Sequence, residues 1–274
     1  MPMIWFLGAL AAGYLTLTAG MYAGQRSLMY HPSDRAPVPS LSGLPEMQAV
    51  RLPVEDGVEL FAWWRPPVRE GAPTLVYFHG NAGNLDDRAG RARIFLDQGY
   101  GLLLKTYRYN AGAGGAPSEA ALIADGLAAV DWLAAEHGVG ADRIALYGES
   151  LGSGVAAALL AEGRGAALIV DGGFDSIAHV AQGAYPYLPA KWLVKDRFDN
   201  AARLGDAHGA PKLIVHGGRD RIIPLKRARA LYDAAAEPKR FEILEEGGHS
   251  DLYDHGMADL VNAFLAEAFG PRKR

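Results

Sequence analysis

The chain has 274 residues, half of them hydrophobic, and a formal net charge of −4. A chain of this length can bury a large core and fits one domain, because some fold classes often exceed about 200 residues as single domains. The small acidic charge is spread without long blocks of one sign, which argues against a nucleic-acid partner. The absence of cysteine excludes disulfides, thiol catalysis and thiolate metal sites, although it leaves the cellular compartment open.

The first element is an uncharged amino-terminal segment. Residues 1–25 contain no Asp, Glu, Lys, Arg or His. In helical form they reach roughly 37 Å, enough to cross a hydrocarbon core of about 30 Å. We therefore predict a transmembrane or membrane-anchor helix over residues 1–25 and a membrane localisation. Two alternatives stay open: a cleaved signal peptide, which the lack of a basic start disfavours, and a helix that packs on the protein or lies at the interface.

The flanks and glycines of this segment bear on its orientation and association. Arg26 and Arg35 follow it and no Lys or Arg precedes it, which favours a cytoplasmic location for the rest of the chain. Gly20 and Gly24 have the spacing that lets two membrane helices approach closely, so a homodimer through this helix is one expectation. The same spacing is also common in glycine-rich apolar sequence without any such role.

A linker at residues 26–46, rich in proline, separates this helix from the main domain, to which we assign residues 47–271. Two strand patterns joined by the hairpin signal Glu55-Asp56-Gly57 open the domain. Apolar and amphipathic stretches then alternate as in an α/β fold, with a mostly parallel sheet and helices on both faces. The expected strands are 47–53, 58–64, 75–78, 101–105, 143–147, 167–170, 212–216 and 240–244, and the expected helices are 86–98, 118–136, 151–162, 225–236 and 255–269.

One long segment interrupts this alternation. Residues 172–209 lie between two strands and are broken by prolines, so we expect a small cap inserted next to the strand ends. Its aromatic side chains could line a channel for an acyl chain or form the core of the cap itself. The candidate substrate-binding residues in this segment are Phe174, Tyr185, Tyr187 and Trp192.

The pentapeptide Gly148-Glu149-Ser150-Leu151-Gly152 stands between a strand pattern and a helix pattern. At such an elbow the serine takes a strained backbone conformation, and the flanking glycines are needed where a Cβ would collide with neighbouring elements. We predict Ser150 as a nucleophile and the backbone N–H of Leu151, at the helix start, as an oxyanion donor. A lone match of this kind also occurs in ordinary glycine turns, so the prediction depends on the other segments.

An acid and a base follow in the order Ser, Asp, His that this architecture requires. Asp220 comes just after the strand at 212–216, at the sheet edge where ligand sites lie. The alternatives for Asp220 are a cap on the following helix or an ion pair with a neighbouring arginine. His249 stands in the glycine turn after the strand at 240–244 and has the best position of the eight histidines.

In the predicted triad, His249 takes the proton from Ser150, while Asp220 fixes the tautomer and stabilises the imidazolium. His79 and His216 each end an apolar run before a glycine, and we expect both to support loop geometry. No metal or organic cofactor is implied, because the chain offers no coherent ligand cluster such as H-E-x-x-H.

A further glycine-rich turn, His79-Gly80-Asn81-Ala82-Gly83-Asn84, follows the strand at 75–78. It resembles the loop after the third strand of α/β-hydrolases, in which the residue after His-Gly donates a backbone N–H to the oxyanion hole. The resemblance implies Asn81 as that donor. An ordinary strand-to-helix loop with Asn84 as helix cap is the alternative, and both can hold.

Almost the whole chain resembles membrane-anchored serine hydrolases of the α/β-hydrolase domain-containing group, in the branch of Bem46-type proteins. The resemblance implies the α/β-hydrolase fold, the triad Ser150, Asp220 and His249, and Asn81 and Leu151 as oxyanion donors. It is carried by the apolar anchor with Gln25-Arg26-Ser27-Leu28-Met29-Tyr30-His31-Pro32, the loop at 79–84, the elbow at 148–152, and His216-Gly217-Gly218-Arg219-Asp220 with Ile223-Pro224.

One loop departs from the family pattern. Thr106-Tyr107-Arg108-Tyr109-Asn110-Ala111 stands where family members usually carry Asp-Tyr-Arg-Gly-Tyr-Gly. Tyr109 in place of glycine restricts this loop and adds bulk to the expected pocket wall. We therefore keep Tyr107 and Tyr109 as candidate substrate-binding residues.

These features together predict a membrane-anchored hydrolase that cleaves an ester or thioester of a fatty or other carboxylic acid through an acyl-Ser150 intermediate. Its expected partners are the membrane and a small-molecule or lipid acyl substrate. Lipases, depalmitoylating thioesterases and peptidases share this triad, and the sequence leaves them open. Outside enzymes, the alternative is a catalytically inactive membrane-tethered scaffold, which the altered loop would permit.

Overall fold

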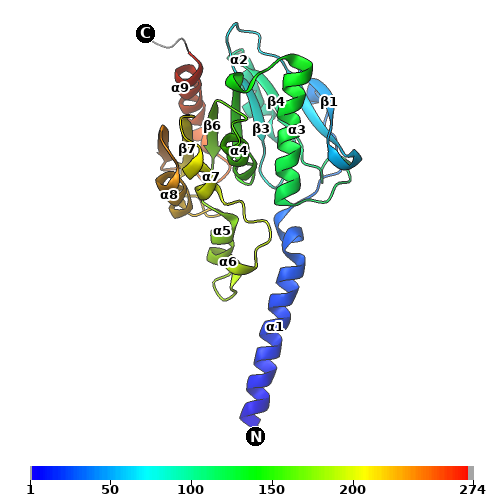
Figure 1. Cartoon of the computed structure of the whole chain (residues 1–274), viewed down its shortest axis with the longest axis vertical. Helices are drawn as coiled ribbons and strands as arrows, with labels where there is room; N and C mark the ends of the chain where they lie inside the picture. Colours follow the sequence, from blue (N-terminus) through cyan, green and yellow to red (C-terminus); the bar gives the residue numbers. More distant parts are fainter. Residues whose placement is uncertain (1, 271–274) are drawn as a thin grey trace.

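The computed structural model describes residues 2–270 and is built around an eight-stranded sheet (Figure 1). The strand order is β1-β2-β4-β3-β5-β6-β7-β8, with β1 and β2 antiparallel to their neighbours and the other strands parallel. The predicted parallel sheet with antiparallel opening strands is confirmed. The strands are β1 (Gln48–Pro53), β2 (Glu59–Arg65), β3 (Thr74–Phe78), β4 (Gly101–Lys105), β5 (Ile144–Glu149), β6 (Ala167–Asp171), β7 (Lys212–Gly217) and β8 (Lys239–Leu244).

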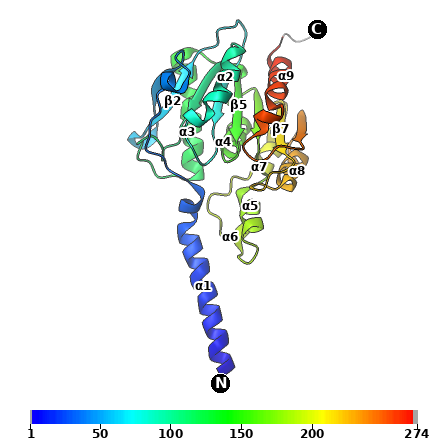
Figure 2. The same cartoon turned by 180° about the vertical axis from the view of Figure 1, so that it is seen from behind.

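Helices cover both faces of the sheet (Figures 1 and 2). The α-helices that the structure describes are α1 (Pro2–Met29), α2 (Ala89–Asp97), α3 (Glu119–His137), α4 (Gly152–Ala161), α5 (Ile177–Ala184), α6 (Ala190–Leu193), α7 (Asn200–Asp206), α8 (Leu225–Ala234) and α9 (Met257–Phe269). Short 3-10 helices are η1 (Pro39–Ser42), η2 (Glu55–Gly57), η3 (Asp86–Arg88), η4 (Ala141–Arg143) and η5 (Leu252–His255).

The central strands are apolar throughout because both of their faces are buried. Successive side chains of a strand point to opposite faces, so Leu75 and Tyr77 pack in the cluster under α2 and α9. Val76 and Phe78 pack in the other cluster, with α3, α4 and α8. The sheet therefore divides the hydrophobic core into two layers.

The parallel register brings several loops to one edge of the sheet. Phe78 pairs with Gly148, Glu149 pairs with Asp171, and Asp171 pairs with Val215. The strands β3, β5, β6 and β7 therefore end close to the same level, and the loops that follow them meet there.

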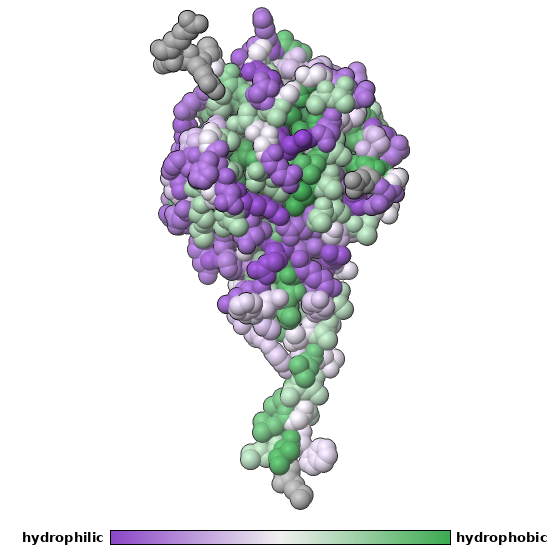
Figure 3. Space-filling view, in the orientation of Figure 1, coloured by the Kyte–Doolittle hydropathy of each residue, from purple (hydrophilic) through white to green (hydrophobic). Residues whose placement is uncertain are grey.

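The amino-terminal helix α1 protrudes from the body of the molecule (Figure 2). It continues to Met29, four residues past the predicted end at residue 25, because Arg26 remains within helical hydrogen bonding to Tyr30. Between Met3 and Met29 it is long and apolar enough to cross a membrane, by length and composition. Figure 3 shows this end of the molecule in green and white, whereas purple hydrophilic residues gather on the body.

The segment expected to be an irregular cap at 172–209 contains three helices. Ser176 caps α5 by accepting a hydrogen bond from the backbone N–H of His179. Only α5 and α6 stand apart from the body; α7 contacts α4 and α8 and belongs to the main helical layer. Phe198 anchors α7 because its ring fills the space beside Gly154. The cap is therefore smaller than predicted.

The segment at 30–46 is bound to the body rather than a free linker. Trp63 Nε1 donates a 3.0 Å hydrogen bond to the carbonyl oxygen of Pro37. Both backbone polar groups of Ser33 are hydrogen-bonded. Its N–H donates to Asn110 Oδ1, and its carbonyl oxygen accepts from the Ala111 N–H. These contacts fix where α1 leaves the body of the molecule.

Candidate active site

Ser150, His249 and Asp220 form a continuous line of hydrogen bonds at the carboxyl edge of the sheet. Ser150 Oγ lies 3.0 Å from His249 Nε2. His249 Nδ1 lies 2.7 Å from Asp220 Oδ2. The three side chains come from the loops after β5, β8 and β7, which the parallel register brings together. This is the geometry of a nucleophile, its general base and the group that orients the base.

The elbow places the Ser150 hydroxyl above the sheet. Ser150 has φ of +49°, in the left-handed region that non-glycine residues seldom adopt. A Cβ at Gly152 would collide with the carbonyl oxygen of Phe78, and a Cβ at Gly148 would meet the backbone of Ser153. The elbow therefore needs glycine at both positions, because helix α4 and strands β3 and β5 approach one another there without side chains between them.

Asp220 is held by its own turn as well as by the histidine. Its Oδ1 accepts hydrogen bonds of 2.8 Å from the backbone N–H groups of Ile222 and Ile223. Burial would raise the pKa of Asp220, but the hydrogen bond from His249 and the backbone donors bring it below the ordinary value. Asp220 is therefore an ionised acceptor at neutral pH. Its carboxylate does not cap α8, and Arg219 pairs with Glu246 instead.

The loop that carries His249 is fixed from two sides. Arg91 Nη2 donates a 2.8 Å hydrogen bond to the carbonyl oxygen of Ser250, and Asp251 accepts one of 2.6 Å from the N–H of Gly248. Burial would lower the pKa of His249, but the hydrogen bond to Asp220 and its charge raise it above the ordinary 6.5. The ring is thus a stronger base than a free imidazole.

Asn81 and Leu151, the two expected oxyanion donors, line the same pocket as Ser150. Leu151 immediately precedes α4, where the first N–H groups have no partner within the helix. Asn81 lines the same pocket, and its side-chain Nδ2 donates to the carbonyl oxygen of Met29 at 2.9 Å. The preceding turn is held by Tyr107, whose hydroxyl donates to the carbonyl oxygen of His79 at 2.6 Å. Both expected donors therefore belong to rigid turns that line the pocket.

His79 and His216 bind backbone carbonyls. His79 Nδ1 donates to the Gly80 carbonyl at 2.7 Å, and His216 Nε2 donates to the Ile223 carbonyl at 2.8 Å. Burial, the first cause in each case, lowers the pKa of both rings, that of His79 to about 3. Both are therefore neutral at pH 7 and support the loops, as their positions before glycines indicate.

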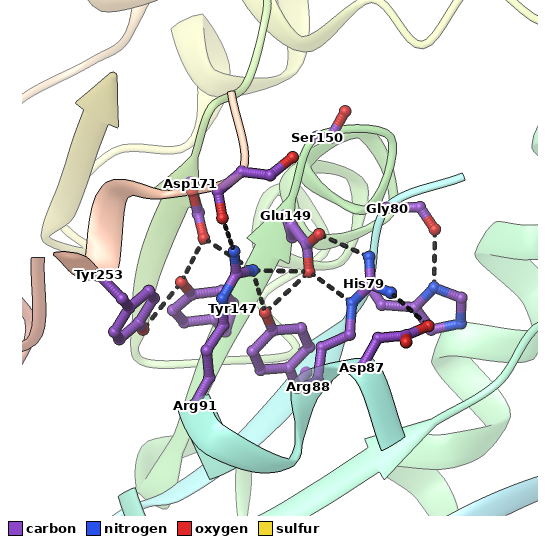
Figure 4. A network of polar contacts seen from close by, with 12 residues as sticks. His79, Gly80, Asp87, Arg88, Arg91, Tyr147, Glu149, Ser150, Asp171 and Tyr253 are labelled. Carbon is purple, nitrogen blue, oxygen red and sulfur yellow. Dashed lines mark hydrogen bonds and ion pairs between the residues drawn. The ribbon is translucent and has the colours of Figure 1, made fainter. Parts of the chain in front are cut away.

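A network of charged and phenolic groups lies directly beneath the elbow (Figure 4). Arg88 binds Glu149 through two contacts, Nη2 to Oε1 at 2.7 Å and Nε to Oε2 at 3.0 Å. Arg91 Nη1 lies 3.0 Å from Glu149 and 3.5 Å from Asp171. The tyrosines at 77 and 147 donate hydrogen bonds to these two carboxylates. The network joins the elbow to α2 and, through Arg91, to the histidine loop.

The pKa values of the two carboxylates in this network are shifted in opposite directions. Burial would raise the pKa of Glu149, but Arg88 and then Arg91 outweigh it and lower this pKa to about 2. For Asp171, burial prevails over the attraction of Arg91 and raises the pKa to about 6. Sequence analysis missed this network because Glu149 occupies the unspecified position of the elbow motif, and the two arginines show no motif at all.

A pocket of about 460 Å³ opens beside Ser150, within the size range of small-ligand sites. Its polar wall includes Ser150, His249, Asn81 and Leu151. Its apolar wall is made by Met29, Phe174, Ile177, Val180, Ile222 and Ile223. Among the residues that the structure describes, no three His, Asp or Glu side chains are grouped so that they could hold a metal ion.

Among the candidate substrate-binding residues, Phe174 alone lines this pocket. Tyr185 lines a different groove, between α1 and the cap. Tyr187 and Trp192 are exposed on the cap surface, with 60% and 74% of their area accessible. These three aromatic side chains do not line the pocket beside Ser150, contrary to our expectation.

Comparison with known proteins assigns the chain to a family. No protein-family model matches it. Protein MT2364 of Mycobacterium tuberculosis is 37% identical over 272 residues, which cover 97% of this chain and 95% of that protein. Protein bem46 of Schizosaccharomyces pombe is 28% identical and covers 90% of this chain and 87% of its own length. The α/β-hydrolase domain-containing protein WAV2 of Arabidopsis thaliana is 28% identical, with 99% and 98% covered. This chain belongs to the Bem46-type α/β-hydrolases.

Solved structures agree on the fold. The Pyrococcus furiosus esterase Pf2001 superimposes with a TM-score of 0.72 over 88% of this chain and 100% of that one, at 17% identity. At this identity the likeness shows the shared fold alone. The Bem46-type chain therefore has the α/β-hydrolase fold, as its sequence predicts.

The loop in which this Bem46-type chain departs from its family packs into the core. Tyr107 and Tyr109 are buried, and their rings stack with centroids 5.5 Å apart. Tyr30 leans on Tyr109 with centroids 5.4 Å apart. The two tyrosines do not line the pocket beside Ser150, contrary to our expectation, because they fill the space between the oxyanion turn and the chain that leaves α1.

Asn84 differs from its expected role as a helix cap. Its Nδ2 donates to the Arg35 carbonyl at 2.6 Å and to Ser33 Oγ at 3.2 Å. Its Oδ1 accepts only from the next residue, Leu85. In this Bem46-type chain, Asn84 therefore ties the oxyanion loop to the segment after α1, a contact that no local pattern could reveal.

Proposed function

We propose that this protein is a membrane-anchored serine hydrolase that cleaves carboxylic esters or thioesters through an acyl-Ser150 intermediate. The observation that carries the proposal is the line from Ser150 Oγ through His249 to Asp220, with contacts of 3.0 and 2.7 Å. The strained Ser150 backbone and the pocket beside it support the same chemistry. The fold shared with solved esterases is consistent with it.

The reaction follows from the geometry in two balanced steps. Ser150 Oγ attacks the carbonyl carbon as its proton passes to His249 Nε2, and the oxyanion accepts hydrogen bonds from the N–H groups of Asn81 and Leu151. The bond to the alcohol or thiol breaks, and that leaving group takes the proton from His249. Water then gives a proton to His249 Nε2 and attacks the acyl carbon. The bond between that carbon and Ser150 Oγ breaks, Oγ takes the proton back from His249, and the acid is released.

The membrane part of the proposal is that α1 crosses the bilayer and holds the catalytic body at its cytoplasmic surface. The length and apolar composition of α1 support insertion, and Arg26 and Arg35, at and after its carboxyl end, support this orientation. Extraction of the full chain from membranes with alkaline carbonate tests insertion, because a spanning helix stays in the pellet. Protease protection in sealed vesicles tests the side, since only a cytoplasmic body is digested from that face.

Labelling with a fluorophosphonate probe tests the catalytic proposal. The full-length protein in detergent should label and should hydrolyse p-nitrophenyl butyrate, and Ser150→Ala should lose both activities, with kcat falling about 10⁴-fold or more. Ser40→Ala is the matched control, because Ser40 is exposed and distant in the chain from the elbow. A folded wild-type protein that neither labels nor hydrolyses any ester would favour the inactive scaffold.

A further inference from the structure

An apolar groove runs between the protruding helix and the cap. It has a volume of about 220 Å³ and is lined mostly by carbon atoms. Met21 and Leu28 of α1 form one wall, and Ala181 of α5 with Leu188 and Leu193 of the cap form the other. We call this space the anchor groove. Soluble proteins seldom leave such a surface open without a ligand or a membrane to cover it.

The anchor groove adjoins the pocket beside Ser150. Met29, Ile177 and Val180 line both spaces. An apolar surface therefore extends from the nucleophile, past the end of α1, to Thr18 and Met21 in the part of α1 that can span a membrane. One end of this surface lies at Ser150, and the other end lies beside the apolar part of α1.

Polar contacts hold the two walls of the anchor groove together. Arg26 binds Asp196 through two nitrogen atoms at 2.8 and 3.0 Å. Gln25 accepts a 2.7 Å hydrogen bond from the N–H of Lys195 and donates one of 3.3 Å to the carbonyl of Leu193. Tyr14 donates to the carbonyl oxygen of Tyr187. These contacts set the width of the groove, so the space is a built part of the fold.

We propose that the anchor groove holds the acyl chain of a bilayer lipid ester while its carbonyl carbon lies at Ser150. This inference rests on the proposed function and adds the substrate class and the route of entry. An acyl chain suits the site because it is long, narrow and apolar, and because α1 forms one wall at membrane depth. Each methylene that the groove takes from water strengthens binding roughly fourfold.

A matched pair of alanine substitutions tests the groove. Ala181→Trp fills the groove, whereas Ala23→Trp adds the same ring at an exposed position of α1 that does not line it. With p-nitrophenyl esters from acetate to palmitate, wild type and Ala23→Trp should gain kcat/KM with chain length. In Ala181→Trp the ratio of the palmitate to the acetate kcat/KM should fall about tenfold or more. An unchanged length profile in Ala181→Trp would overturn the inference.

A second measurement does not depend on turnover. Ser150→Ala full-length protein is placed in vesicles of a phosphatidylcholine that carries a diazirine near the end of one acyl chain, and crosslinked peptides are mapped after irradiation. The inference expects crosslinks on the cap at residues 180–188, lost when Ala181→Trp is added and kept with Ala23→Trp. Crosslinks confined to α1 would overturn it. Failure of every ester and of fluorophosphonate labelling, with cap crosslinks intact, would reject the hydrolase and retain the groove.

Discussion

Glu149, the residue immediately before Ser150, is bound by two nitrogen atoms of Arg88 at 2.7 and 3.0 Å. Both side chains are about nine-tenths buried. Because Glu149 ends β5 and Arg88 ends η3, this pair fixes the elbow relative to the oxyanion loop. Arg88 also lines the pocket beside Ser150, so the pair contributes both to the stability of the fold and to the geometry of the site.

Removing Arg88 should destabilise the protein strongly. In Arg88→Met, Glu149 keeps Arg91 but loses its two-point partner, and a buried carboxylate left in this way costs roughly 3 kcal/mol. Urea unfolding of the catalytic body, followed by tryptophan fluorescence, measures the loss. Arg93→Met is the matched control, because Arg93 pairs with Glu46 at a partly exposed position and should cost less than about 1 kcal/mol. Equal losses in the two variants would contradict a special role for the Arg88 pair.

The acid limb of the activity profile should report His249. The reaction needs the neutral ring, and the pKa of His249 lies above 6.5, so kcat/KM should fall as the pH drops through a midpoint above 6.5. In Asp220→Asn the carboxylate that raises this pKa is gone, so the midpoint should move to lower pH and the plateau should fall by about 10⁴-fold. A short soluble ester and the full chain in detergent suffice for the measurement.

Asp254→Asn is the control for this profile, since Asp254 is an exposed carboxylate in the same region of the chain. Its acid limb should coincide with that of wild type. An Asp220→Asn limb that stays in place would mean that another group sets the pH dependence.

Gly152 should not tolerate even a methyl group. A Cβ at Gly152 meets backbone atoms of Phe78 and His79, which no side-chain rotation can relieve, so Gly152→Ala should cost about 2 kcal/mol or more and abolish fluorophosphonate labelling. Gly90→Ala is the matched control, because Gly90 is helical and its Cβ would meet nothing within 4 Å. That variant should gain about 0.5–1 kcal/mol. A labelled Gly152→Ala protein would mean that the elbow can shift.

The sheet and the meeting of Ser150, Asp220 and His249 are accessible from sequence for the same reason. Each of these residues follows a short apolar run, and parallel strands place their carboxyl ends at one edge whatever the helices between them contain. The order of the strands is thus less important for the prediction than the direction that they share. The elbow glycines add a steric signal that survives in the sequence.

Other features depend on contacts between distant segments, which leave no periodic trace. Glu149 and Arg88 meet across 61 positions of the chain. The position of Tyr109 in its loop predicts a pocket residue. In the structure its ring packs against Tyr30 and Tyr107, which makes it part of the core. The cap helix α5 was not predicted, because the prolines that follow it indicate an irregular segment. Such side chains find their roles only when the packing of several elements is known.

Lys105 is a buried cation whose removal should stabilise the fold. It is fully buried at the end of β4, donates a 3.0 Å hydrogen bond to the Thr106 carbonyl and lies 4.6 Å from the centroid of the Tyr107 ring. Burial lowers its pKa from 10.5 to about 8, although Asp125 partly opposes this. Because the folded pKa is below the unfolded one, this lysine costs stability as the pH falls from about 10.5 through 8, by up to about 3 kcal/mol at neutral pH.

Lys105→Met should therefore be more stable than wild type at pH 7, by about 1–2 kcal/mol once the lost hydrogen bond is subtracted. The difference should shrink between pH 8 and pH 10, since wild type regains stability there as the lysine loses its proton. Urea unfolding at the two pH values measures both effects. Lys226→Met, at an exposed position of α8, should change stability by less than about 0.5 kcal/mol at either pH. A Lys105→Met protein that is less stable than wild type at pH 7 would show that the contacts with Thr106 and Tyr107 outweigh the cost of burying the charge.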